Sequence, residues 1–141
     1  MFGNCVWLQL NSTHNMNKII FNFSELFMTH KFIGHFTLDY NIEKQHFNKK
    51  NYIINNLVKD GELYETENNG FFAVQQDYIT DQYPFKKYHL SLAYKLDKPF
   101  NLKERDFIYS IKLDDEIKKE DVQIRLWNCN SKNPKNWKFI K

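Results

Sequence analysis

Two short segments of the sequence share a pattern that suits acid–base chemistry. Residues 35–40 (HFTLDY) and 89–94 (HLSLAY) both read histidine, apolar residue, hydroxyl residue, leucine, any residue, tyrosine. Histidine has an unperturbed pKa of about 6.5, so near neutral pH one imidazole can accept a proton while another donates one. A Ser or Thr hydroxyl can hydrogen-bond a phosphate oxygen. The repeat therefore predicts proton transfer beside a phosphate by two histidines, with no metal or cofactor.

Strand geometry gives the spacing its meaning. Residues i and i+2 of a strand point to the same face, so His35 projects with Thr37, and His89 with Ser91. The apolar residues between them, which are Phe36, Leu38, Leu90 and Leu92, are expected to point into a core. If the two strands lie near one another, two imidazoles and two hydroxyls converge on one groove and can flank a phosphate.

The rest of the chain predicts one mixed domain over residues 1–141. Alternating apolar residues or strand-forming composition predict strands at 5–10, 32–40, 62–66, 71–79, 88–94, 122–127 and 137–140. Apolar residues at helical spacing predict helices over 15–29 and 47–59, the second ended by Gly61. Asn68-Asn69-Gly70 predicts a hairpin turn, and Asn101 with Glu104 predicts a capping box that starts a short helix. The stretch 111–120 is ambiguous. This order is typical of an α+β or α/β fold.

Composition excludes several classes of function. A net charge of +3 permits a phosphate-bearing ligand but does not favour wrapping a DNA duplex. The sequence has no apolar run long enough to span a membrane and no secretory signal, so we expect a cytoplasmic protein. Cys5 and Cys129 lack zinc-ligand spacing and are expected to be buried free thiols. Abundant Lys, Asn, Ile and Phe are typical of an AT-rich genome, such as that of a virus, a phage or a low-GC cell.

The two motifs resemble the signature of the 2H phosphoesterase superfamily, which is a pair of His-x-Thr/Ser-hydrophobic motifs some tens of residues apart. Residues 89–94 are similar to the second motif of the cyclic nucleotide phosphodiesterases, and 122–127 through Trp137 resemble their closing strand, turn and tryptophan. The resemblance implies a bilobal, pseudo-twofold fold with two antiparallel-rich sheets, helices outside and a central groove. It also implies a catalytic tetrad, made of His35, Thr37, His89 and Ser91.

The resemblance implies a metal-independent phosphodiesterase that acts beside a ribose 2′-hydroxyl or on a cyclic phosphate. The substrate classes that follow are 2′-5′ oligoadenylates or cyclic oligonucleotide signals, as in viral or phage counter-defence in a host cytoplasm, and 2′,3′-cyclic phosphate ends of RNA. A non-catalytic nucleotide- or RNA-binding module is the alternative from another functional class. In cleavage by an attacking 2′-hydroxyl, one histidine is the base and the other the acid. We expect His35 as the base and His89 as the acid, but the sequence leaves the opposite assignment open, and the roles can exchange when water attacks a cyclic phosphate. We expect a monomer that binds a nucleotide or short oligonucleotide.

Six further residues are candidates for substrate contact. Tyr94 matches a tyrosine that helps to bind the base in cyclic phosphodiesterases, although strict alternation from His89 turns it to the core unless a bulge or strand end intervenes. Tyr40 ends the first motif, and the segment just before the second motif supplies Tyr83, Phe85 and Lys86. Trp7 is chosen because it lies on the first predicted strand, from which it can line the groove. The histidines outside the motifs, His14, His30 and His46, are assigned no catalytic role.

Overall fold

Two antiparallel four-stranded sheets and two α-helices make up the fold, in a computed structural model that describes residues 3–80, 82, 85–131 and 133–141. The first sheet has the order β2 (His35–Asp39), β1 (Asn4–Leu10), β7 (Val122–Asn128), β8 (Lys138–Phe139). The second sheet has the order β5 (Tyr88–Leu96), β4 (Phe71–Ile79), β3 (Leu57–Asn68), β6 (Glu116–Ile117). Every pairing between neighbouring strands is antiparallel. The expected mixture of strands and helices is confirmed in this form.

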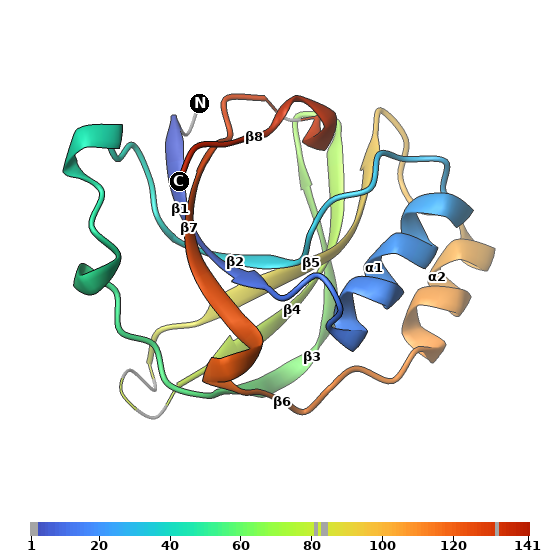
Figure 1. Cartoon of the computed structure of the whole chain (residues 1–141). Helices are drawn as coiled ribbons and strands as arrows, with labels where there is room; N and C mark the ends of the chain where they lie inside the picture. Colours follow the sequence, from blue (N-terminus) through green and yellow to red (C-terminus); the bar gives the residue numbers. More distant parts are fainter. Residues whose placement is uncertain (1–2, 81, 83–84, 132) are drawn as a thin grey trace.

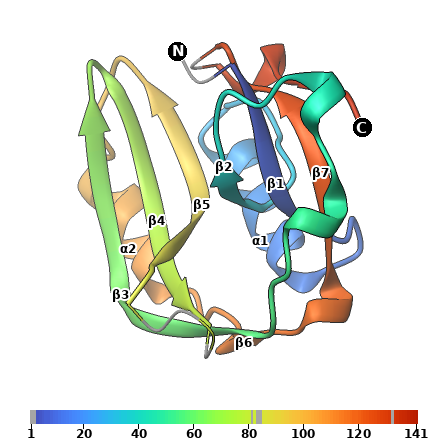
Figure 2. The ribbon, with the colours of Figure 1, turned by 90° about the vertical axis from the view of Figure 1, so that its left-hand side faces the viewer.

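The two motif strands lie next to each other although they belong to different sheets. β2 is the edge strand of the first sheet and β5 the edge strand of the second. These two edges contact one another, and Figure 2 shows them at the boundary where the sheets meet. The helices α1 (Asn15–Leu26) and α2 (Leu102–Ser110) lie on one side of the pair of sheets (Figure 1). The opposite side is therefore left open for the polar side chains of the motifs.

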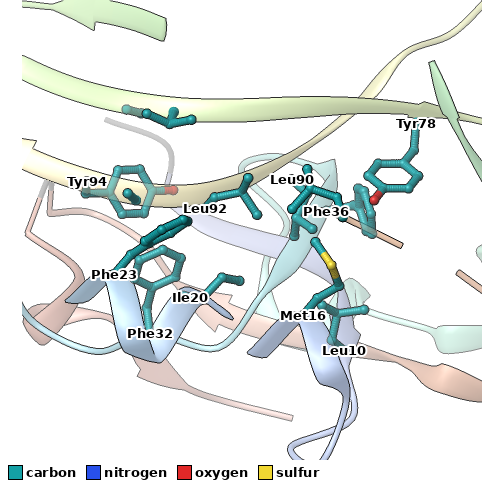
Figure 3. Packing of buried hydrophobic residues seen from close by; sticks show 14 of the residues in the cluster. Leu10, Met16, Ile20, Phe23, Phe32, Phe36, Tyr78, Leu90, Leu92 and Tyr94 are labelled. Atoms are coloured by element: carbon teal, nitrogen blue, oxygen red, sulfur yellow. The ribbon is translucent and has the colours of Figure 1, made fainter. Parts of the chain in front are cut away.

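The core forms where the apolar face of α1 packs against the two motif strands. Ile20 and Phe23 of α1 are almost fully buried, as are Phe36 of β2 and Leu90 and Leu92 of β5. Figure 3 shows these side chains in one packed group. The apolar residues that alternate with the histidines and hydroxyls thus anchor each motif strand, as the sequence predicts for these positions. Burying each such side chain contributes roughly 1.5–3 kcal/mol to stability.

Local sequence signals fix several element boundaries. Asn69 and Gly70 both have positive φ, at 53° and 78°, which is the backbone of a tight hairpin turn between β3 and β4. Asn101 accepts from the backbone N–H of Glu104 at 2.8 Å, and the Glu104 carboxylate accepts from the Asn101 N–H at 2.8 Å. The predicted turn and capping box are therefore confirmed. α1 begins at Asn15 as predicted but ends at Leu26, before Met28 takes up a positive φ of 54°.

The helix predicted over 47–59 is wrong. That stretch holds one short 3₁₀ turn, η2 (Lys49–Asn51), and its last residues belong to β3, which begins at Leu57; another 3₁₀ turn, η1 (Lys44–His46), precedes it. Leu57 is buried where it pairs with Ile117 of β6, and Ile54 is partly buried against the core, whereas Ile53 is exposed. The strand pairing of its last residues therefore takes the place of the predicted helix. Gly61, expected to end the helix, instead has a positive φ of 72° within β3, where the pairing with β4 is irregular. The ambiguous stretch 111–120 contains β6 and begins η3 (Lys119–Asp121); a further 3₁₀ turn, η4 (Pro134–Asn136), precedes β8.

In the part of the chain that the structure describes, neither α-helix is long and apolar enough to cross a membrane.

Candidate active site

A cavity of about 350 Å³ lies between the two sheets and receives both motifs. All four predicted tetrad residues line it, namely His35 and Thr37 of β2 with His89 and Ser91 of β5. The first sheet and its flanking segments also supply Cys5, Trp7, Tyr40, Cys129, Ser131 and Trp137. The second sheet also supplies Thr66, Asn68, Phe71, Gln75 and Tyr94. A larger hollow of about 530 Å³ on another side of Tyr94 contains none of the tetrad.

Both motif strands carry a bulge at the same position of the repeat. Trp7 pairs with Thr37 and Val6 with Asp39, so Leu38 is an extra residue in β2. In β5, Ser91 and Ala93 pair with successive residues of β4, so Leu92 is likewise extra. An extra residue reverses the alternation that follows it. The bulges therefore bring the tyrosine that ends each motif to the same face as its histidine.

His35 is held in an aromatic enclosure. It is only 8 % exposed, and the indole of Trp7 stacks on its imidazole with ring centroids 3.4 Å apart and planes 7° apart. Trp137 meets the same ring edge-on at 5.6 Å. Its Nδ1 lies 2.7 Å from the carbonyl oxygen of Ile33, which can only accept, so Nδ1 carries the proton when the ring is neutral. The lone pair of a neutral His35 is then on Nε2, the nitrogen left to meet a ligand.

Burial decides the protonation state of His35. Desolvation lowers its pKa to about 4, the bond to Ile33 opposes this change, and a charge on His89 adds to it. Relative to the usual value of about 6.5, this disfavours the imidazolium by about 3 kcal/mol. Stacking of an imidazolium on an indole contributes roughly 0.5–2 kcal/mol in the opposite direction, which is too little to reverse the sign. His35 is therefore neutral at neutral pH and can accept a proton.

His89 has a different environment. The residue is exposed, unlike His35, and so lies where the cavity meets solvent. It pairs across the strands with Asp77 of β4. Desolvation lowers the pKa of His89, while the negative charge of Asp77 raises it. Asp77 also accepts a hydrogen bond from the Tyr64 hydroxyl at 2.6 Å, which holds the carboxylate in place. Of the two histidines, His89 is the one whose protonated form is favoured by a neighbouring negative charge.

The two hydroxyls have matched surroundings. Ser91 accepts a hydrogen bond from the Gln75 amide at 3.3 Å and is hydrogen-bonded with Tyr94. Thr37 is hydrogen-bonded with Tyr40 in the same way. Burial raises the pKa of Tyr94 to about 12 and also raises that of Tyr40, so both phenols keep their protons and can donate. Each motif thus presents a histidine, a hydroxyl and a phenol to the cavity.

The structure brings some of the other predicted contact residues to the cavity and leaves others away from it. Tyr94, Tyr40 and Trp7 line the cavity. Lys86 lines a separate hollow of about 390 Å³ and sits 5.1 Å from the ring centroid of Tyr88. Phe85 is 99 % exposed, and Tyr83 lies outside the described residues.

Sequence reasoning missed the contribution of the β3–β4 hairpin. Thr66, Asn68, Phe71 and Gln75 reach the cavity because β4 pairs with β5, which places Gln75 opposite Ser91. Alternation along β4 puts Phe71, Gln75 and Asp77 on one face. The sequence of β4 therefore indicates which of its residues face the cavity, provided that its pairing with β5 is known. Cys5 and Cys129 are buried and are not joined in a disulfide, as predicted, and both border the cavity.

No protein-family model, curated protein or solved structure matches this chain.

Proposed function

We propose that the protein is a metal-independent phosphodiesterase of the 2H type that cleaves a nucleotide phosphodiester beside a ribose 2′-hydroxyl, or a cyclic phosphate. The observation that carries the proposal is the pair of histidines facing one cavity in unlike environments. Matched bulges in β2 and β5 support an internal pseudo-twofold relation between the two motifs. The bilobal 2H fold belongs to the same proposal.

The environments of the histidines support distinct roles. His35 is buried, neutral and has Nε2 available, which suits a general base. His89 has Asp77 beside it, which suits a general acid. Proton transfers of this kind typically contribute about 10²–10⁴-fold each to the rate.

The reaction with a cyclic phosphate then proceeds as follows. His35 takes a proton from water as the water oxygen forms a bond to phosphorus, and His89 gives a proton to the ribose oxygen as its bond to phosphorus breaks. Thr37 and Ser91 hydrogen-bond the non-bridging oxygens, where negative charge increases in the transition state. For a linear phosphodiester, the adjacent 2′-hydroxyl takes the place of the water.

The cavity suits one nucleotide unit of such a substrate. Its volume of about 350 Å³ lies in the range of small-molecule sites, roughly 300–1,000 Å³. Phe71 and Tyr94, whose ring centroids are 4.8 Å apart, offer aromatic surface beside Ser91. A base can pack on such surface. The amides of Asn68 and Gln75 supply donors and acceptors in the same cavity.

A substrate panel tests the proposal. The protein is incubated with 2′,3′-cyclic mononucleotides, 2′-5′ oligoadenylate and cyclic dinucleotides, with and without EDTA. The matched variants are His35→Ala and, as the control, His46→Ala, which removes an exposed histidine of η1 outside the cavity. We expect at least one substrate to be cleaved in EDTA, with His35→Ala losing about 10²-fold or more and His46→Ala retaining full activity.

Cleavage that EDTA abolishes would contradict the metal-independent mechanism. Binding of a nucleotide without cleavage of any panel member would instead favour the non-catalytic module.

A further inference from the structure

Trp7 lies at the centre of a stack of three rings. β1 runs between β2 and β7, so Trp7 has a neighbouring strand on each side. His35 stacks on its indole from β2 at a centroid distance of 3.4 Å, and Trp127 stacks on it from β7 at 4.6 Å and 15°. The indole of Trp127 is itself fixed, because its Nε1 donates to the Gln9 side chain at 2.9 Å. Trp7 is 2 % exposed and cannot turn without disturbing both neighbours.

The stack determines the surroundings of the His35 ring. Trp7 covers one face, while Trp137 and Phe32 meet the ring edge-on at 5.6 and 6.5 Å. The Ile33 carbonyl holds Nδ1 at 2.7 Å. Stacking on Trp7 and the hydrogen bond at Nδ1 together fix the plane of the His35 ring. Because Nδ1 is engaged, Nε2 is the nitrogen that can react.

We propose that Trp7 is a positioning residue that fixes the plane of the His35 imidazole and shields it from water, so that Nε2 meets the substrate as a proton acceptor. The proposal rests on the phosphodiesterase function above for its kinetic consequence. Its structural consequence, the effect on the protonation of His35, does not depend on any activity.

The other titratable groups around the cavity do not replace the effect of Trp7. They come from four segments and are His89 and Tyr94 on β5, Tyr40 after β2, Cys5 on β1 and Cys129 after β7. Among them, a charge on His89 acts directly on His35, and it opposes protonation. Burial is the largest cause of the lowered pKa, and the stacked indole supplies a whole face of that burial.

Two effects of the indole predict opposite results when it is removed. Shielding from water favours the neutral imidazole, so its loss raises the pKa of His35. A cation–π interaction favours the imidazolium, so its loss lowers the pKa. The direction of the change therefore identifies which effect the indole exerts.

The experiment is an NMR titration of the histidine ring signals in the wild type, Trp7→Leu, Trp7→Phe and Phe23→Leu. Trp7→Phe keeps an aromatic face. Phe23→Leu trims a buried ring of α1 away from the cavity, and so controls for general loss of stability. We expect Trp7→Leu to raise the pKa of His35 from about 4 to about 5 or higher, and both other variants to leave it nearly unchanged.

An unchanged or lowered pKa of His35 in folded Trp7→Leu would overturn the proposal. So would an equal rise in Phe23→Leu, because that would reflect loosening of the whole fold. Should Trp7→Leu fail to fold, Trp7→Met replaces it in the same titration.

On a substrate that the enzyme cleaves, Trp7→Leu should lower kcat about tenfold and move the acid limb of the kcat/KM profile to higher pH, and Trp7→Phe should restore both. If no substrate is cleaved, the proposed phosphodiesterase function is contradicted, whereas the titration still tests whether Trp7 shields His35 from water.

Discussion

His35 and His89 occupy the same position of matched motifs, yet their neighbours set them apart. His35 is enclosed by rings and its pKa falls to about 4, because the hydrogen bond to Ile33 offsets only part of the loss of water around an imidazolium. The pKa of His89 falls below its usual value, but the charge of Asp77 limits the change. When two residues of the same type have different surroundings, their pKa values differ, and one can act as the acid and the other as the base in one site.

These pKa values predict a bell-shaped pH profile with an acidic optimum. The base must be neutral, so kcat/KM rises with pH until His35 loses its proton near pH 4. The acid must be protonated, so kcat/KM falls as pH rises through the pKa of His89, which is below 6.5. The kcat/KM profile reports the free enzyme, so it is the measurement to make.

Asp77→Asn provides the matched test of the alkaline limb. The variant keeps an acceptor for the Tyr64 hydroxyl but removes the charge that raises the pKa of His89. The alkaline limb should move to lower pH while the acid limb stays in place. A shift of the alkaline limb to higher pH would show that Asp77 does not act on the general acid.

At the residue scale, the strand period of two is local information, so the sequence alone predicted that each motif histidine shares a face with the hydroxyl two residues later, and all four side chains do line the cavity. The sequence could not decide where Tyr40 and Tyr94 point, because that depends on bulges at Leu38 and Leu92. A bulge depends on how a strand pairs with its neighbour, and the sequence of one strand does not specify which strand it pairs with or in what register.

At the scale of elements, the β3–β4 hairpin forms one wall of the cavity. Its turn places Asn68 and Phe71 on either side of Asn69 and Gly70, and both flanking residues line the cavity. The shape of that wall therefore depends on two residues with positive φ.

Gly70→Ala tests this dependence. Gly70 has a φ of 78°, and an added Cβ would meet only the Asp97 carboxylate at 3.5 Å, so the cost comes from the backbone and not from a clash. We expect a loss of about 1–2 kcal/mol in the free energy of unfolding, measured by urea denaturation. Asn69→Gly, at a φ of 53°, is the control and should be neutral or slightly stabilising. An equal loss in both variants would contradict the assignment of the cost to backbone conformation.

The predictions of elements succeeded where the signal was local and failed where it was not. The Asn69-Gly70 turn and the Asn101 capping box involve residues within a few positions of one another. The predicted helix over 47–59 had apolar residues at helical spacing, but Leu57 finds its partner in β6, 60 positions along the chain. Tertiary pairing overrides such a periodicity.

At the scale of the whole molecule, burial of a neutral histidine links stability to pH. Unfolded His35 binds a proton below about pH 6.5, whereas folded His35 does so only below about pH 4. Between these values the unfolded state binds more protons, so the free energy of unfolding falls as the pH falls. The same direction applies to His89, whose pKa is also lowered.

We expect His35 to contribute a loss of about 2 kcal/mol between pH 7 and 4.5, measured by urea denaturation. His35→Asn should remove most of this slope, while His46→Ala should retain it. A slope that His35→Asn leaves unchanged would show that other groups carry the acid sensitivity. Stopping at pH 4.5 limits the contribution of carboxylates with lowered pKa values, such as Glu104, because an unfolded glutamate is only about half protonated there, whereas unfolded His35 is almost fully protonated.

The two sheets meet at β2 and β5, and this contact brings the two motifs to one cavity. The periodicity within either motif cannot predict that contact. The resemblance to the 2H phosphoesterases implied such a groove, and the four motif side chains do line one cavity. Whether they work as a unit is a property of the molecule that kinetics measures directly.

The most direct measurement is a double-mutant cycle on kcat/KM with EDTA present, using wild type, His35→Ala, His89→Ala and the double variant on the best substrate of the panel. Groups that act in one concerted step are strongly non-additive, so we expect each single variant to lose about 10²–10⁴-fold and the double variant to lose little more than the worse single one. Losses that multiply in the double variant, or a single variant that keeps wild-type activity, would contradict a two-histidine phosphodiesterase.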